Sequence, residues 1–301
     1  MSPNETDAVK RQRSCTAARI STVEEETSDD SHSDSEMEEE AIYINDPVHG
    51  MLEIHPLCKA VIDTPEFQRL RFIKQCGISY FVYPGATHTR FDHSLGVCYL
   101  ALKVVKRLNE LESNAVSPEE SLCIQLAGLC HDLGHGPFSH FWEYFVSYAT
   151  NTKFHHEDMS IKIFDYLIEK NSLREKFAKY GLYDEHLQLI KDLIMGTPSR
   201  YKTMTPELFL FEIVANKENG LDIDKYEYLI KDSYFFGTEV SPDFERYLTC
   251  LKIVEDPELG VKHIGYREKL KTNIISVFKH RAVMHDIGYQ HRVCKKIEAI
   301  Q

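Results

Sequence analysis

Long hydrophobic runs, paired cysteines and an excess of basic residues are all missing from this sequence. No apolar stretch approaches the ~20 residues that a membrane helix needs, and residues 1–15 contain no apolar segment of the secretory kind. The eight cysteines form no C-x-x-C pair. These absences argue against a membrane span, a secretory signal and a disulfide framework, so we expect a protein of a reducing compartment.

Acidic residues outnumber basic residues by 47 to 35, and this excess is uneven along the chain. The net charge is −12, and residues 1–40 hold twelve acids and four bases, so the rest of the chain carries only −4. A mildly acidic body is not a general nucleic-acid-binding surface, although it can contain a local basic pocket for a phosphorylated small molecule. Single-stranded nucleic acid stays open as a partner only if a local basic groove exists.

The composition of residues 1–41 indicates a disordered acidic tail. The run from Glu24 to Glu40 consists almost entirely of Glu, Asp and Ser and cannot bury enough apolar surface to fold. Lys10–Arg13 is a short basic cluster that favours a nuclear location, with the cytoplasm as the alternative. We expect residues 42–301 to form a single folded domain.

Helical signals dominate the rest of the chain. Thr64 followed by Pro65 is typical of a helix start, and Ser117 with Glu120 forms a capping-box pattern ahead of an apolar run that ends at Cys130. Alternating strand patterns are scarce. The sequence therefore predicts a mostly α fold, with further helices near residues 156–171, 184–195, 206–216, 221–234, 241–254 and 267–282.

The most informative motif is the doublet His131-Asp132, which falls at the C-terminal end of the helix predicted before it. An adjacent histidine and aspartate can offer one nitrogen and one oxygen to the same divalent cation. His93 and an aspartate of the segment 219–226 could complete the ligand set. Asp222 and Asp224 compete for that place, and residues two apart on a helix face different sides, so only one can point inward.

Four segments of the chain carry an ordered set of motifs: Ile44–Gly50, Asp63–Arg71, Arg90–Gly96 and Leu129–His140. This set resembles the catalytic domain of the vertebrate sterile-alpha-motif and HD-domain deoxynucleoside triphosphate triphosphohydrolases, within the HD-domain phosphohydrolase superfamily. The resemblance covers residues 42–301 and implies an HD-domain helical bundle around a metal site. It also implies a short form that lacks the sterile-alpha-motif domain and the C-terminal lobe.

The resemblance implies hydrolysis of deoxynucleoside triphosphates to deoxynucleoside and inorganic triphosphate, and with it control of nucleotide pools, antiviral defence in innate immunity and DNA repair. His156 would be the catalytic acid, oriented by Glu157. The implied metal ligands are His93, His131, Asp132 and Asp224. Family position decides here for Asp224 over Asp222.

Further roles follow from the same resemblance. The implied catalytic residues are His156, Glu157, His135 and His140, the last two near the α-phosphate. The implied substrate-binding residues are Gln75, Arg90, His135, His140, Lys225, Tyr228, Asp232, Arg281 and Tyr289. The implied allosteric nucleotide-binding residues are Tyr43, Asn45, Asp63, Gln68, Arg71, Arg246, Arg267, Lys269, Asn273, His291 and Arg292.

The expected cofactors are a divalent metal at the His-Asp site, zinc or iron with manganese also allowed, and magnesium on the nucleotide phosphates. GTP or a deoxynucleoside triphosphate would act as allosteric activator, and a dimer or tetramer is expected if regulation survives. The chain departs from the family at Ile42, Cys76, Cys250 and Ile287. The alternative is therefore a weak or inactive HD-domain protein that binds nucleotides or nucleic acid and regulates a full-length partner.

Overall fold

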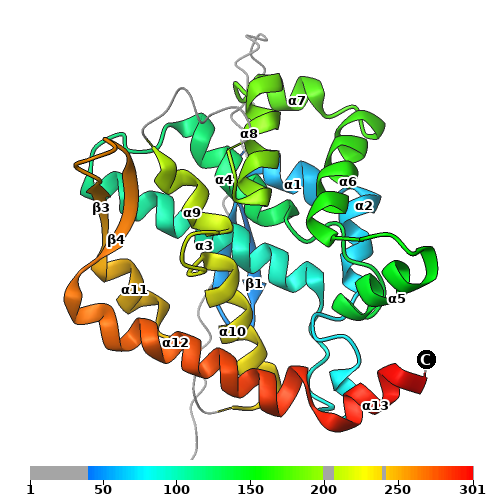
Figure 1. Cartoon of the computed structure of the whole chain (residues 1–301). Coiled ribbons are helices and arrows are strands. Elements are labelled where there is room, and N and C mark those ends of the chain that lie inside the picture. Colours follow the sequence, from blue (N-terminus) through cyan, green and yellow to red (C-terminus); the bar gives the residue numbers. More distant parts are fainter. Residues whose placement is uncertain (1–39, 199–206, 239–241, 301) are drawn as a thin grey trace, which may run out of the picture. The chain divides into compact units, whose positions relative to one another are not determined.

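Helices dominate the computed structural model, which describes residues 40–198, 207–238 and 242–300 (Figure 1). The mostly α fold expected from the sequence is confirmed. The predicted acidic tail lies almost wholly outside the described residues, as does Lys10–Arg13. The helices are α1 Pro56–Ile62, α2 Pro65–Gln68, α3 Arg90–Leu111, α4 Pro118–Cys130, α5 His140–Thr150, α6 His156–Lys170, α7 Arg174–Lys179, α8 Asp184–Met195, α9 Phe211–Val214, α10 Ile223–Phe236, α11 Phe244–Cys250, α12 Lys271–Met284 and α13 Arg292–Ile300.

Short helical turns connect several of these elements. Four are 3-10 turns, and the fifth is a π-helical turn that joins α12 to the segment before α13. No helix in the described ranges has both the length and the apolar character needed to cross a membrane. The turns are Arg69–Phe72, Ser79–Phe81, Leu208–Leu210, Glu268–Leu270 and His285–Tyr289.

Two antiparallel hairpins were not predicted from the sequence. Strands β1 (Ile42–Asp46) and β2 (Gly50–Ile54) pair around a tight turn, and β3 (Leu251–Glu255) pairs with β4 (Lys262–Tyr266). The predicted helix 241–254 is wrong over its last four residues, because α11 ends at Cys250 and β3 begins there. Pairing with β4, which is a tertiary event, overrides the local helical pattern.

The centre of the domain is built from α3 and α4, with α10 against α3 and α8 against α4 (Figure 1). Every residue of α4 from Leu122 to Cys130 is buried, which explains why its apolar residues cover most of the helix. The predicted capping box is present, since Ser117 Oγ accepts from Glu120 N and Glu120 accepts from Ser117 N. Helix α3 was not predicted, although it is the longest described helix and Thr89 caps it with Asp92.

The arrangement of these helices positions a site. The N-termini of α3, α6 and α10 meet the C-terminal end of α4, so side chains from four separate segments face one another. Helix ends held by a buried core are rigid, and this rigidity is what a metal or catalytic centre requires.

Candidate functional site

Four metal-ligating side chains converge at the meeting point of α3, α4 and α10. His93 Nε2 lies 3.2 Å from His131 Nε2, 3.0 Å from Asp224 Oδ1 and 3.4 Å from Asp132 Oδ2. His131 Nε2 lies 3.4 Å from Asp224 Oδ1 and 3.5 Å from Asp132 Oδ1. Ligands about 2.0–2.2 Å from one metal ion are roughly 3.0–3.5 Å apart. The spacing therefore fits a single divalent cation.

The hydrogen bonds on the outer side of each imidazole strengthen this fit. His93 Nδ1 donates to Glu227 Oε2, and His131 Nδ1 donates to Gly128 O at 2.8 Å. Each ring then presents the lone pair of Nε2 to the centre, where the other groups are carboxylate oxygens. Acceptors facing acceptors need a cation between them, and the tautomers are the ones that metal-ligating histidines adopt.

The electrostatics of these four residues, His93, His131, Asp132 and Asp224 (the quartet), also favour a bound cation. Burial alone would lower the pKa of His93, but Glu227, Asp224 and Asp132 together raise it to about 10. The pKa of His131 is raised in the same way, because Asp132 and Asp224 outweigh burial. The electric field that favours protons on these two imidazoles also favours a divalent cation in place of the protons on Nε2.

The two candidate aspartates have different positions. Asp224 lies in the first turn of α10 and faces His93 and His131, and its pKa is held well below the usual range because these histidines outweigh burial. Asp222 is the N-cap of α10, accepts from Lys225 N at 3.0 Å and also pairs with Lys225 Nζ at 3.2 Å. Asp224 is the one that joins the metal-ligating group.

A second histidine cluster lies beside the quartet. His156 Nε2 is 3.9 Å from Asp132 Oδ1, and its ring stacks on His135 with ring centres 4.0 Å apart. His135 is buried, and burial followed by the nearby Arg90 lowers its pKa well below the usual range. His140 is largely exposed, with its ring 5.0 Å from that of His135.

The sequence expects Glu157 to orient His156, but Glu143 is the nearer partner. Glu143 Oε1 accepts from His156 Nδ1 at 2.7 Å, whereas Glu157 Oε2 lies 3.4 Å from the same atom. Glu143 also accepts from His140 Nδ1 at 3.1 Å, and these bonds outweigh burial and lower its pKa. Glu157 follows His156 directly on α6 and faces another side of the helix, while Glu143 reaches across from α5.

The loop after the doublet is fixed against α6. Ser160 Oγ donates to His131 O at 2.5 Å and accepts from Gly134 N at 2.8 Å. A Cβ on Gly134 would lie 2.0 Å from His156 O, so only glycine allows this approach. Arg69 donates to the carbonyls of Leu133 and His135 from the opposite side. Arg69 thus supports the loop, a role that sequence reasoning missed.

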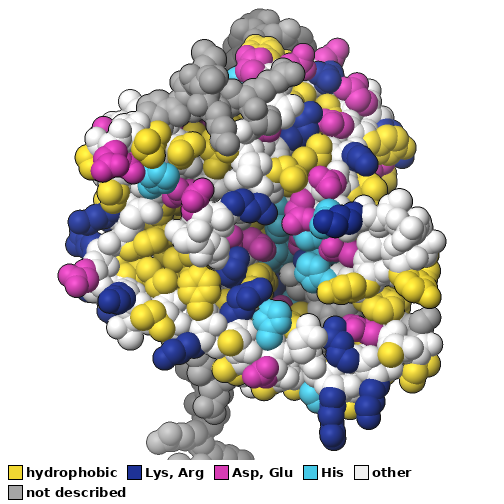
Figure 2. All heavy atoms as spheres, viewed as in Figure 1, with side chains coloured by type: hydrophobic (Ala, Val, Ile, Leu, Met, Phe, Trp, Pro, Cys, Tyr) yellow, Lys and Arg dark blue, Asp and Glu magenta, His cyan; other side chains and the backbone are white. Residues whose placement is uncertain are grey.

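A cavity of about 470 Å³ opens beside both clusters. Figure 2 shows Lys, Arg and His side chains around a hollow in the middle of that face. All nine residues predicted to bind substrate line it, together with the predicted catalytic residues. The lining includes Gln75, Cys76, Arg90, His131, Asp132, His135, His140, His156, Glu157, Asp224, Lys225, Tyr228, Asp232, Arg281, His285, Tyr289 and Lys295.

Arg90 has a different first partner from the one expected. It was predicted to hold phosphates, yet it is buried and its guanidinium donates to Asp132 Oδ2 at 2.5 Å, Ser139 Oγ at 3.0 Å and Gln75 O at 3.3 Å. Arg90 is also the main reason that the pKa of Asp132 stays well below its usual range despite burial. Arg90 therefore holds the Asp132 carboxylate at the cavity wall, and its predicted contact with phosphate stays a prediction.

One part of the cavity lining is polar and aromatic. Tyr289 donates to Asp232 Oδ2 at 2.5 Å, and Asp232 Oδ1 pairs with His88 Nε2 at 2.6 Å. Gln75 Oε1 is buried there without a protein partner. Cys76 has its thiol pKa raised well above the usual range by burial and then by Asp232.

The predicted allosteric residues are spread over several elements and line neither this cavity nor a second cavity of about 300 Å³ beside the β1–β2 turn. Tyr43 and Asn45 lie on β1, and Arg71 packs over Phe91 at 3.5 Å and donates to Gln68. Their nucleotide-binding role stays a prediction. The others are Asp63 at the end of α1, Arg246 on α11, Arg267 and Lys269 at the turn 268–270, Asn273 on α12, and His291 and Arg292 at α13.

Comparison with known proteins identifies the family. Residues 90–232 match the HD domain, a segment that contains all four candidate metal ligands. The chain therefore contains an HD domain. It is 44% identical over 271 residues to the deoxynucleoside triphosphate triphosphohydrolase SAMHD1 of Bos taurus, which covers 85% of this chain and 46% of that protein.

Two further relatives give the same picture. The Homo sapiens protein of the same name is 43% identical over 272 residues, covering 85% of this chain and 43% of its own. A Dictyostelium discoideum SAMHD1 homolog is 38% identical over 285 residues, covering 93% and 52%. The HD-domain chain thus spans about half the length of the curated relatives it matches.

Proposed function

We propose that this HD-domain protein hydrolyses deoxynucleoside triphosphates to deoxynucleoside and inorganic triphosphate in the 470 Å³ cavity. One observation carries the proposal: His131, Asp132 and Asp224 of the quartet, the His156 cluster and the cations Lys225 and Arg281 all border the same cavity, and His93 contacts Asp224. A triphosphate bears about four negative charges, so its binding needs cations on the cavity wall. The relatives are named deoxynucleoside triphosphate triphosphohydrolases, which points to the same substrate class.

The metal would be held by His93, His131, Asp132 and Asp224, and this donor set suits zinc, iron or manganese, with magnesium on the phosphates. When bound, the cation would stabilise the negative charge that develops on the phosphate oxygens. The residues themselves supply the orientation: Arg90 holds Asp132, and Glu227 and Gly128 O hold the two imidazoles.

The protein's own acid would be His156. Hydrolysis joins a water oxygen to the α-phosphorus and breaks its bond to the 5′ oxygen of the sugar, which leaves as a poor alkoxide unless it receives a proton. His156 Nδ1 is held by Glu143, so Nε2 faces the quartet and the cavity. A histidine in this orientation can donate its Nε2 proton to the leaving oxygen, and Glu143 stabilises the charged ring beforehand.

Sugar selection would come from the polar and aromatic part of the cavity lining. The Tyr289 hydroxyl is bound to Asp232, which fixes the ring beside the cavity. A ring packed against C2′ would leave no room for a 2′ hydroxyl, and the unpartnered Gln75 Oε1 offers an acceptor to a sugar hydroxyl.

Regulation and context are further parts of the proposal. GTP or a deoxynucleoside triphosphate would activate the enzyme through the predicted allosteric residues in a dimer or tetramer. Control of nucleotide pools in the nucleus, and through it antiviral defence, would follow from the reaction. These points rest on the resemblance of the sequence motifs to that family.

Product analysis tests the reaction. Purified metal-replete protein is incubated with deoxyguanosine triphosphate, with and without GTP, beside a His131→Ala/Asp132→Ala control. Deoxyguanosine and intact triphosphate, both lost in the control, are expected. In ¹⁸O water the label should appear in triphosphate and not in deoxyguanosine. Release of pyrophosphate or orthophosphate instead, or no turnover in either condition, would contradict the proposal.

A further inference from the structure

A chain of buried charges leads from the β1–β2 turn to the candidate metal ligand His93. Glu227 is fully buried, and Lys231 is 1% exposed. Lys231 Nζ lies 2.8 Å from Glu227 Oε1 and 3.0 Å from Asp46 Oδ2. Glu227 Oε2 in turn accepts from His93 Nδ1. Buried ions are costly unless each has a partner, so such a chain needs a reason beyond packing.

The residues of α10 and α3 leave space for the Glu227 carboxylate between the two helices. Asp224, Glu227 and Lys231 recur at helical spacing and occupy one face of α10. On α3, Gly96 follows His93 by one turn, and a Cβ there would lie 2.0 Å from Glu227 Oε1 and 2.7 Å from its Cδ. The missing side chain at position 96 therefore makes room for the carboxylate that contacts His93.

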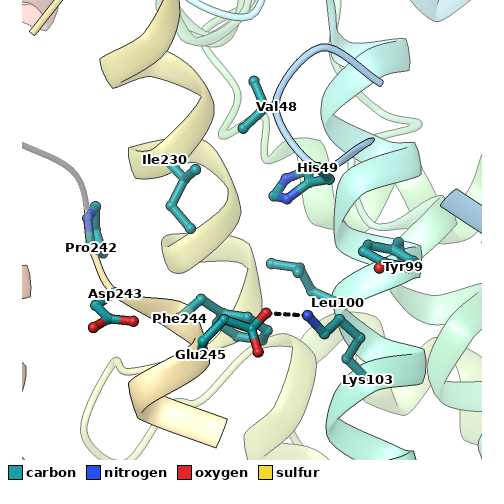
Figure 3. Close-up of a pocket in the computed structure, with 10 residues that line it drawn as sticks. All are labelled: Val48, His49, Tyr99, Leu100, Lys103, Ile230, Pro242, Asp243, Phe244 and Glu245. Carbon is teal, nitrogen blue, oxygen red and sulfur yellow. Dashed lines mark hydrogen bonds and ion pairs between the residues drawn. The ribbon is translucent and has the colours of Figure 1, made fainter. Parts of the chain in front are cut away.

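The turn between β1 and β2 contacts both Lys231 and Glu227. Asp46 Oδ1 accepts from Val48 N at 2.8 Å and His49 N at 2.9 Å, while Oδ2 receives Lys231. The His49 ring lies 3.3 Å from Glu227 Oε1. His49 also lines the second cavity, where Figure 3 shows its ring beside Val48 and Ile230.

We propose that Glu227 is the positioning residue for the metal ligand His93, and that Lys231 and Asp46 hold it in place. This inference rests on the metal centre of the proposed function. A carboxylate on Nδ1 fixes the tautomer that leaves Nε2 free for the metal, aims the ring and makes the imidazole a better donor. The ion pair with Lys231, whose Nζ lies 2.8 Å from Glu227 Oε1, keeps the carboxylate in this position.

Glu227→Gln tests the role, since it keeps the shape and removes the charge. Glu212→Gln is a matched control: Glu212 is also buried and pairs with a histidine, His263 Nδ1 at 2.5 Å, and with Ile264 N at 2.7 Å. Chelator-stripped proteins are titrated with Mn²⁺, and free Mn²⁺ is read by electron paramagnetic resonance. Thermal unfolding in EDTA compares the stability of the metal-free proteins.

We expect Mn²⁺ to bind Glu227→Gln about 10- to 100-fold more weakly than the parent protein, and Glu212→Gln to bind it as the parent does. The Mn²⁺ concentration for half-maximal turnover should shift by the same factor. If Glu227→Gln does not fold, Asp46→Asn, at the far end of the chain of charges, should weaken Mn²⁺ binding in the same direction. Unchanged affinity, or equal losses in Glu227→Gln and Glu212→Gln, would overturn the inference.

The outcomes separate the two proposals. A parent protein that binds Mn²⁺ but releases no triphosphate, with weakened binding in Glu227→Gln, overturns the proposed reaction and supports the positioning role. A parent protein that releases triphosphate, with Glu227→Gln binding Mn²⁺ normally, does the reverse. A parent protein that binds no divalent metal overturns both.

Discussion

Gly134 lies where the loop after His131-Asp132 meets the first turn of α6, and replacing it with alanine gives a direct test of the site geometry. The new Cβ would lie 2.0 Å from His156 O and 2.6 Å from Ser160 N. Both are backbone atoms, so no change of side-chain rotamer can relieve the contact. The loop and α6 must move apart.

The size of that movement sets the expected effect. Ordinary Cβ contacts begin near 3.4 Å, so the first turn of α6, which carries His156, must retreat by more than 1 Å. A misplacement of about 1 Å costs roughly 100-fold in rate, equivalent to about 2.7 kcal/mol in the activation barrier. Overpacking of a buried contact costs about 1–3 kcal/mol of folding stability.

We therefore expect Gly134→Ala to fold, to lose about 1–3 kcal/mol in urea unfolding, and to release triphosphate about 100-fold more slowly. Gly260→Ala is the control. Gly260 lies between β3 and β4 with a φ of 64° and nothing within 4 Å of the position a Cβ would take, so alanine there costs about 1–2 kcal/mol of stability through the backbone alone. Gly260→Ala should keep its turnover, and wild-type turnover in Gly134→Ala would refute the reasoning.

Three further predictions concern other parts of the chain. Glu143→Gln should reduce kcat about 100-fold and Glu157→Gln less, because Glu143 is the nearer partner of His156; equal losses in steady-state assays would contradict this. Burial lowers the pKa of His280 from its usual 6.5, so the unfolded chain binds a proton that the folded protein does not, and stability falls as the pH drops below about 6.5. His280→Gln should therefore reduce the pH dependence of the free energy of unfolding, measured in urea from pH 7.5 to 5.5. An unchanged pH dependence would count against this reasoning. Burial raises the pKa of Cys76, so iodoacetamide should modify this thiol at pH 7.5 at least about 10-fold more slowly than a free cysteine, as read by mass spectrometry; rapid modification would show that the thiol is not so enclosed.

The sequence predictions agreed with the structure where they depended on neighbouring residues. The capping box at Ser117 and the apolar run to Cys130 specify α4 and place His131-Asp132 at its end. Helix periodicity allowed only one of Asp222 and Asp224 to face inward, and the family resemblance was needed to choose Asp224. These features depend on residues close together in the chain, so a sequence contains them.

The partners of these residues depend on contacts between distant segments. Glu143 comes from α5 to His156 on α6, and Glu227 comes from α10 to His93 on α3. The spacing of Asp224, Glu227 and Lys231 was present in the sequence as a signal, but Lys231 could have been a solvated helix charge. Only the approach of α3, with Gly96 leaving space, makes these charges buried partners.

The sequence by itself determined the metal-ligating residue types, the helical class and the order of the motifs, because these follow from side-chain chemistry and local periodicity. Tertiary structure alone decided which carboxylate contacts which histidine, that Arg90 donates to Asp132, and that residues 251–255 form a strand. Each of these outcomes is settled by burial and by hydrogen bonds between separate elements of the fold, whose free energies exceed the local preferences.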